Sequence, residues 1–91
     1  MTNDTHPFLV SVWVTPKPPA QAPFDRPYWM EMARCQSEMR ATEVADCLAI
    51  RNRLVQLSKL QASAVEGIWW APVRHWPDEE TVKRETGRWG A

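Results

Sequence analysis

Residues 42–66 read TEVADCLAIRNRLVQLSKLQASAVE, and the fold prediction depends on this stretch. Neither glycine nor proline occurs between Tyr28 and Val65, so nothing here interrupts a helix. Thr42 is a suitable N-cap, and acidic residues follow it in the first turn, where the helix dipole favours them. Gly67 is the first glycine of the chain and is suited to end the helix. The sequence therefore predicts one amphipathic helix over residues 42–66.

The apolar residues of this predicted helix fall into two groups around its axis, at about 100° per residue. One group contains Ile50, Leu54, Leu57 and Ala64, and the other contains Val44, Leu48, Val55 and Ala62. Arg51 and Ser58 lie between the two groups. A helix with so broad an apolar arc usually contacts two neighbours. We therefore expect one group to face the core of this chain and the other to face a partner.

The segments before this helix carry strand, proline and helix patterns. Residues 8–14 alternate between two faces and are rich in β-branched side chains, which predicts a strand. A proline-rich arm of extended backbone follows over residues 16–27, and the polar residues 1–6 are expected to be flexible. Apolar residues spaced by three and four predict a helix over residues 28–40. The alternative for this segment is a strand through YWMEMARC.

After residue 66 the sequence GIWWAPVRHW predicts a second strand. Pro72 removes a ladder donor, so we expect this strand at a sheet edge or with a bulge. Residues 77–87 predict a short peripheral helix with acidic residues early, basic residues late and a terminal glycine. The predicted fold is a single α+β domain over residues 1–91. A small two-stranded sheet, which a partner would complete, packs on the long amphipathic helix, with a preceding helix and a short C-terminal helix.

Composition is that of a small globular protein. The chain has 91 residues, 44% hydrophobic and 24% charged, which allows one domain with a modest core. Eleven basic residues balance eleven acidic ones, so the chain has neither the basic surplus of a duplex-binding protein nor the acidic surplus of a DNA mimic. Two cysteines are too few for a secreted disulfide framework, and no apolar run reaches the length of a membrane span. We therefore expect a soluble cytoplasmic protein without a membrane partner.

No sequence motif indicates catalysis, metal binding or nucleotide binding. Cys35, Cys47, His6 and His75 lack the close spacing of ligand pairs in zinc sites. Cys47, His75 and Asp78 are the one trio that could supply a nucleophile, a base and an orienting carboxylate, and a chain of this size offers such a trio by chance. We therefore expect no enzyme activity, no catalytic residue, no metal and no cofactor.

Tryptophan is unusually frequent, with six in 91 residues. A core this small can hardly enclose six indoles of roughly 150–250 Å² each, so at least one is expected at an interface. Several of them lie in the segment WWAPVRHW beside basic side chains, and one arginine interrupts the apolar arc of the predicted helix. The residues expected to bind a protein are Trp13, Arg51, Trp69, Trp70, Arg74 and Trp76.

These features predict a non-enzymatic protein–protein interaction module. Examples are an accessory subunit, or a small inhibitor or adaptor of the kind that bacteria and phages encode. Its partner is another protein or a second copy of itself. The alternative is a binder of single-stranded nucleic acid or nucleotides, whose bases stack on the same Trp/Arg segment. Asp78, Glu79 and Glu80 follow that segment directly and would repel phosphate, which favours the contact with protein.

Overall fold

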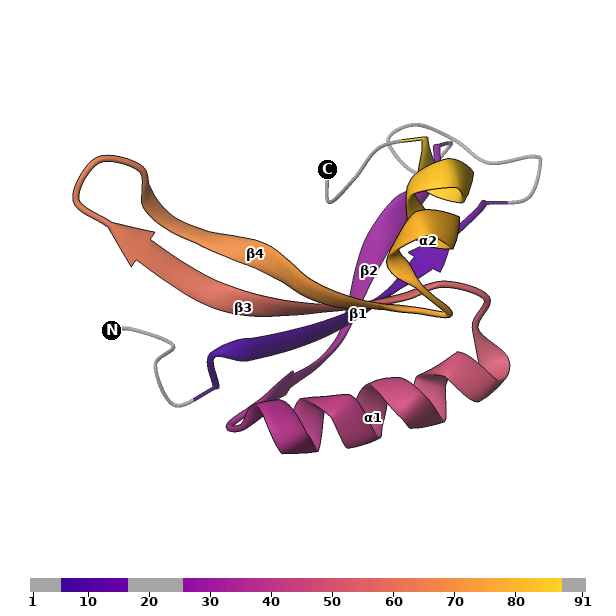
Figure 1. Ribbon diagram of the computed structural model, residues 1–91, viewed down its shortest axis with the longest axis horizontal. Coiled ribbons are helices and arrows are strands. Elements are labelled where there is room, and N and C mark those ends of the chain that lie inside the picture. The colour runs from indigo at the N-terminus through magenta and orange to yellow at the C-terminus, as the bar shows by residue number, and fades with distance from the viewer. Residues whose placement is uncertain (1–5, 17–25, 88–91) are drawn as a thin grey trace.

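A computed structural model of the chain describes residues 6–16 and 26–87, which form four strands and two helices (Figure 1). The strands are β1 (Phe8–Val14), β2 (Tyr28–Cys35), β3 (Val55–Ser63) and β4 (Gly67–Trp76), and the helices are α1 (Glu38–Arg51) and α2 (Glu79–Thr86). All neighbouring strands are antiparallel, in the order β2-β1-β3-β4. β1 and β3 therefore lie inside the sheet, and β2 and β4 form its edges.

The predicted two-stranded sheet with three helices is wrong, because the described residues form a four-stranded sheet and two helices. The helix predicted for residues 42–66 is correct only in its first part, since α1 ends at Arg51. Asn52 has an extended backbone, and both its backbone N–H and its side-chain amide donate to the carbonyl oxygen of Leu48, at 2.8 and 2.9 Å. These two hydrogen bonds close the last turn of α1, and the chain continues into β3.

β3 forms because residues 55–63 also alternate with a period of two. Leu57 is fully buried on the α1 side of the sheet, opposite Val10 of β1. The pattern VQLSKLQAS suits either period, and β3 receives backbone partners from β1 on one side and from β4 on the other. The two apolar groups expected on one helix therefore belong to different elements. Ile50, for example, is 83% exposed on α1 and faces no core.

The helix predicted for residues 28–40 is also wrong, and the chain forms the alternative strand as β2. β2 pairs with β1 in two registers, with a shift between Val10 and Ser11 that leaves Met32 without an opposite residue. Such a bulge adds one residue to a strand and shifts the side-chain alternation by one position. The bulge explains why YWMEMARC alternates poorly in polarity although it is a strand.

α1 begins earlier than the predicted cap Thr42, which lies inside the helix. The N-cap is Ser37, whose Oγ accepts a hydrogen bond from the backbone N–H of Arg40 at 3.2 Å. Ala41 and Ala45 are fully buried, so α1 presents small side chains to the sheet and can lie close to it. The core between them consists of Phe8, Val10, Val12, Cys35, Ala41, Ala45, Val55, Leu57 and Trp76.

The predicted strand at residues 8–14 and the predicted strand GIWWAPVRHW are confirmed as β1 and β4. β4 is an edge strand, and its register with β3 shifts between Leu57 and Ser58, next to the pair that Ser58 forms with Pro72. Both expectations for this proline, the edge and the bulge, are therefore confirmed.

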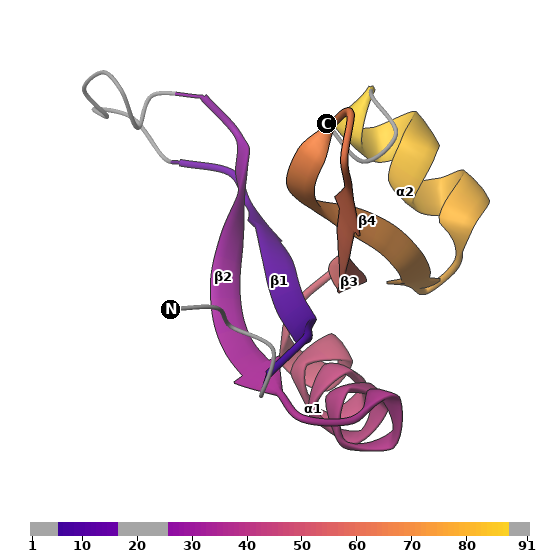
Figure 2. The ribbon, with the colours of Figure 1, turned by 90° about the vertical axis from the view of Figure 1, so that its left-hand side faces the viewer.

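α2 lies within the predicted residues 77–87, between the N-cap Asp78 and the C-cap Gly87. Val82 is fully buried, and Glu85 accepts two hydrogen bonds from Arg53, at 2.5 and 2.6 Å. The hydrogen bonds join α2 to the segment between α1 and β3, and α2 also contacts β4. Figures 1 and 2 show the two helices well apart with the sheet between them. No helix of residues 6–16 and 26–87 is long and apolar enough to cross a membrane. The predictions for residues 1–6 and 16–27 fall largely outside the described residues.

β3 and β4 continue beyond β1 as a projecting hairpin (Figure 1). β1 pairs with β3 only as far as Lys59, whereas β4 pairs with β3 as far as Ser63. The backbone N–H of Leu60 still donates to the carbonyl oxygen of Pro7, at 2.8 Å. We call residues 60–70 the distal hairpin.

Candidate functional site

The two sides of the sheet carry different side chains, because partners in an antiparallel ladder point to the same side. On the side of α1, pairs such as Val10 with Leu57 are apolar. On the far side, which points away from α1, Gln56 pairs with Ser11 of β1 and with His75 of β4. All three of these polar residues are buried, with at most 7% of their surface exposed.

The buried polar side chains form a hydrogen-bonded chain. His75 Nε2 lies 2.8 Å from Gln56 Oε1, and Gln56 Nε2 donates to Ser58 Oγ at 3.3 Å. Because an amide oxygen only accepts, His75 Nε2 carries the proton of this contact. Burial lowers the pKa of His75, and the negative charge of Glu79 opposes this in part. The site therefore favours the neutral imidazole, which acts as a hydrogen-bond donor within the sheet.

Two half-buried tryptophans lie beside this chain on the far side. The ring centroids of Trp13 and Trp29 are 5.2 Å apart in an edge-to-face arrangement, and the ring of Trp29 is 6.2 Å from that of His75. Trp29 Nε1 is buried and has no hydrogen-bond partner within the described part of the chain. The centre of the far side is thus a packed layer of aromatic and polar side chains.

On the distal hairpin the far side becomes apolar. Side chains two residues apart on a strand share a side, so the pairs Leu60–Trp70 and Ala62–Ile68 continue the side of Ser58. Leu60 and Trp70 are half-buried, while Ala62 is exposed and Ile68 is 67% exposed. We call these four residues the apolar hairpin face. The opposite side of the hairpin carries Lys59, Gln61, Ser63 and Trp69.

Arg34 of β2 borders the apolar hairpin face. Its guanidinium carbon lies 5.5 Å from the ring centroid of Trp70, and it donates two hydrogen bonds to Glu31, at 2.7 and 3.1 Å. The hydrogen bonds and the charge of Glu31 raise the pKa of Arg34. A cation over an indole is attracted by the negative face of the ring. The apolar face therefore ends at a cation and a carboxylate that are both exposed.

The structure places the predicted contact residues on several surfaces. Trp13 and Trp70 lie on the far side of the sheet. Trp76 is 9% exposed, and its Nε1 donates to Asp46 Oδ1 of α1 at 2.8 Å, which makes it part of the core. The guanidinium of Arg74 lies 4.8 Å from the ring centroid of Trp76 on the same side.

The remaining two predicted contact residues lie elsewhere. Trp69 is 37% exposed on the opposite side of the distal hairpin, and Arg51 is exposed in the last turn of α1. The six predicted residues therefore do not form one surface. Of these six, only Trp70 belongs to the apolar hairpin face.

Sequence reasoning missed Ile68 as a candidate contact residue although its strand was predicted, and it missed Arg34, Leu60 and Ala62 because their segments were assigned to helices. The signal for the last two was present in SKLQAS, residues 58–63, where small or apolar residues alternate with polar ones. Such alternation is typical of a strand with one side turned to water.

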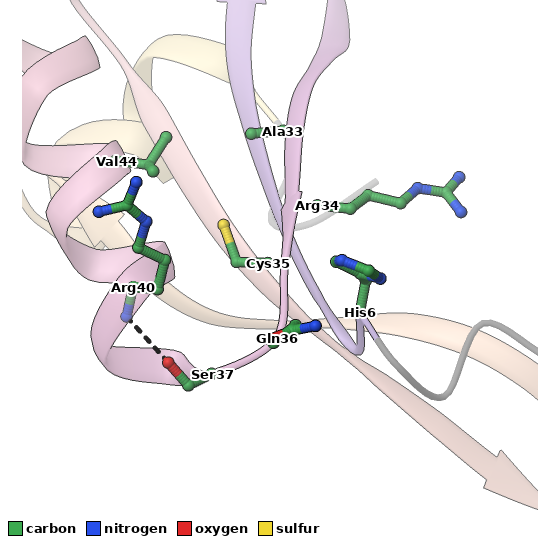
Figure 3. A pocket seen from close by; sticks show the side chains of 8 residues that line it. All are labelled: His6, Ala33, Arg34, Cys35, Gln36, Ser37, Arg40 and Val44. Atoms are coloured by element: carbon green, nitrogen blue, oxygen red, sulfur yellow. Dashed lines mark hydrogen bonds between the residues drawn. The ribbon is translucent and has the colours of Figure 1, made fainter.

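A separate pocket of about 500 Å³ lies where β2 leads into α1 (Figure 3). Its lining consists of His6, Ala33, Arg34, Cys35, Gln36, Ser37, Arg40 and Val44. Figure 3 shows the sulfur of Cys35 directed toward α1 and the guanidinium of Arg34 directed away from it. The pocket therefore does not aim these groups at one point. Cys47, the other thiol, is exposed on α1, while His75 is buried on the far side of the sheet, so the trio considered from the sequence is not assembled.

No protein-family model, curated protein or solved structure matches the chain.

Proposed function

We propose that this protein is a non-enzymatic interaction module that binds a protein partner through its apolar hairpin face. The observation that carries the proposal is Ile68, which is 67% exposed on a projecting hairpin and shares one side with Leu60, Ala62 and Trp70. A two-stranded hairpin alone is only marginally stable in water. Covering its apolar side removes that surface from water and stabilises the hairpin at the same time. This role fits an accessory subunit, an adaptor or an inhibitor.

The composition of the surface supports a protein partner. Tryptophan and arginine are enriched in protein interfaces, and a polar rim usually surrounds the apolar centre. Trp70 supplies the aromatic anchor, while Arg34 and Glu31 supply a rim of both signs. Binding a protein through this surface requires no catalytic group.

Affinity capture from the native host tests the proposal. We expect Ile68→Lys to lose the protein that the wild type captures, because a buried lysine without a partner charge destabilises an interface. The control is Gln61→Lys, which places the same charge on the opposite side of the same hairpin. Equal capture by the wild type and Ile68→Lys would contradict the proposal, and circular dichroism establishes that both variants are folded.

One observation favours the alternative, a binder of single-stranded nucleic acid. Arg34 stacks near Trp70 on the same side of the sheet as Trp13 and Trp29, and base-stacking proteins use such aromatic platforms. Against it, Glu31 already holds the guanidinium, and the formal net charge is zero. Titration of tryptophan fluorescence with oligothymidine distinguishes the two, since binding to phosphates weakens steeply with salt.

A further inference from the structure

We propose that the occupant of the apolar hairpin face is a second copy of this chain, related by a two-fold axis. The inference rests on the proposed function and specifies its partner. In this arrangement the two distal hairpins pack face to face in opposite directions. The tip of each hairpin then reaches over the far side of the other copy's sheet.

The small size of the distal hairpin favours a second copy as its partner. Four residues on each strand of the distal hairpin, at about 3.3 Å per residue and with strands about 4.8 Å apart, cover only roughly 130 Å² of flat face. A stable interface buries roughly 800 Å² on each partner. The hairpin alone is therefore too small, and the contact must extend to the sheet beside it. A two-fold axis extends the contact in this way, because the hairpin of each copy packs on the sheet of the other.

A second hairpin would cover further apolar surface on the far side of the sheet. Leu9 and Pro72 are half-buried beside Ser58 on the far side, next to the apolar hairpin face. The tip carries Val65, which is 94% exposed. A tip that reaches over the second copy's sheet would cover Val65 with these apolar side chains. Sheets that pack face to face bury interdigitated side chains in this way.

The charges of the chain also favour a second copy. The chain carries no formal net charge, so self-association meets no overall repulsion. A two-fold interface brings each surface against its own copy, and a surface with charges of one sign would repel itself. The apolar hairpin face is bordered by Arg34 and Glu31, which supply both signs. Because the two side chains pair with each other, this border carries no surplus charge that would repel a second copy.

Sedimentation velocity of the full chain at tens of micromolar tests the proposal. We expect a species of twice the monomer mass of 10.5 kDa for the wild type and for Gln61→Lys, and a monomer for Ile68→Lys. A monomeric wild type would overturn the second copy as partner. A dimer that Ile68→Lys leaves intact would overturn the face.

Cross-linking locates the contact independently of these charge variants. In a Cys47→Ser background the remaining cysteine, Cys35, is buried, so an added thiol is the exposed one. We expect a short bismaleimide to couple two copies of Ala62→Cys and not of Gln61→Cys, since the two positions lie on opposite sides of the hairpin. Equal coupling at both positions contradicts the proposal. If the wild type is a monomer and Ile68→Lys nevertheless loses a captured protein, the proposed function stands with a foreign partner and the second copy is excluded.

Discussion

Trp76 joins the sheet to α1 through one hydrogen bond, from its Nε1 to Asp46 Oδ1 at 2.8 Å. We expect Trp76→Phe to lower the free energy of unfolding by about 2 kcal/mol, because a hydrogen bond to a charged acceptor is lost from a buried ring. Urea denaturation measures the change. A double-mutant cycle with Asp46→Ala is the control. Fully additive effects in this cycle would show that the two side chains do not interact.

His75 makes the stability depend on pH. Burial lowers its pKa from the ordinary value of 6.5, so between the two values the unfolded chain binds a proton that the folded chain does not. The stabilising effect is fully present above pH 6.5 and is lost as the pH falls through that window. Each unit by which the pKa is lowered corresponds to about 1.4 kcal/mol.

The variant His75→Gln separates this effect from other titrations. Glutamine retains a side-chain N–H for Gln56 but does not titrate, so we expect the difference in urea midpoint between pH 7.5 and 5.5 to be smaller than in the wild type. The same pH dependence in both proteins would contradict the role of His75.

The directions and partners of single side chains also explain why only part of the candidate site could be predicted. Trp69 and Trp70 are consecutive in a strand, so they point to opposite sides and cannot belong to one surface. Trp76, predicted as a contact residue, is instead buried against α1. Its indole N–H already has a partner in Asp46, which lies 30 residues away in sequence and which no local pattern connects to it.

At the scale of elements, the beginning of α1 offers a direct test. Ser37 caps the helix through Oγ, whereas Thr42, the cap expected from sequence, lies inside it. We expect Ser37→Ala to lower the free energy of unfolding by about 1 kcal/mol, and Ser37→Asp to preserve it. Thr42→Ala is the matched control, with an expected change below about 0.5 kcal/mol. A larger loss of stability from Thr42→Ala than from Ser37→Ala would contradict Ser37 as the N-cap of α1.

Elements whose signals are local could be predicted, and those that depend on distant partners could not. β1 alternates between two faces, β4 begins at a glycine and is rich in tryptophan, and α2 has a cap at each end; each of the three forms as expected. β2 contains a bulge that hides its alternation, and β3 consists largely of residues that also favour helices. Residues 55–63 form a strand because they pair with β1 and β4, and their sequence alone is compatible with either a strand or a helix.

At the scale of the whole molecule, the sheet is supported unevenly. Residues 55–59 of β3 pair with strands on both sides, whereas the distal hairpin pairs only within itself beyond Leu60. We expect amide hydrogens of residues 55–59 to exchange slowest and those of residues 61–63 to exchange fast in dilute protein. Hydrogen-exchange mass spectrometry measures both. Uniform protection along β3 in dilute protein would contradict this gradient.

The sheet order could not be derived from the sequence, because two of its four strands were assigned to helices. With only β1 and β4 recognised, the natural prediction was a pair of strands that a partner completes. The structure places β3 between these two strands and β2 on the outer side of β1. The sheet does not need a strand from a partner, and the reason to expect a partner is the exposed apolar side of the distal hairpin.

The position of β1 inside the sheet governs the order in which the chain can fold. Trp13 pairs with Trp29 nearby in sequence, whereas Val12 pairs with Val55, 43 positions later. Closing the longer loop costs more conformational entropy, and chains rich in such distant pairs fold more slowly. β1 and β2 therefore have time to pair while the other edge of β1 is still open. During that interval the β-branched residues of β1 are exposed to other unfolded chains, so the slowest pairing step is also the one most vulnerable to aggregation.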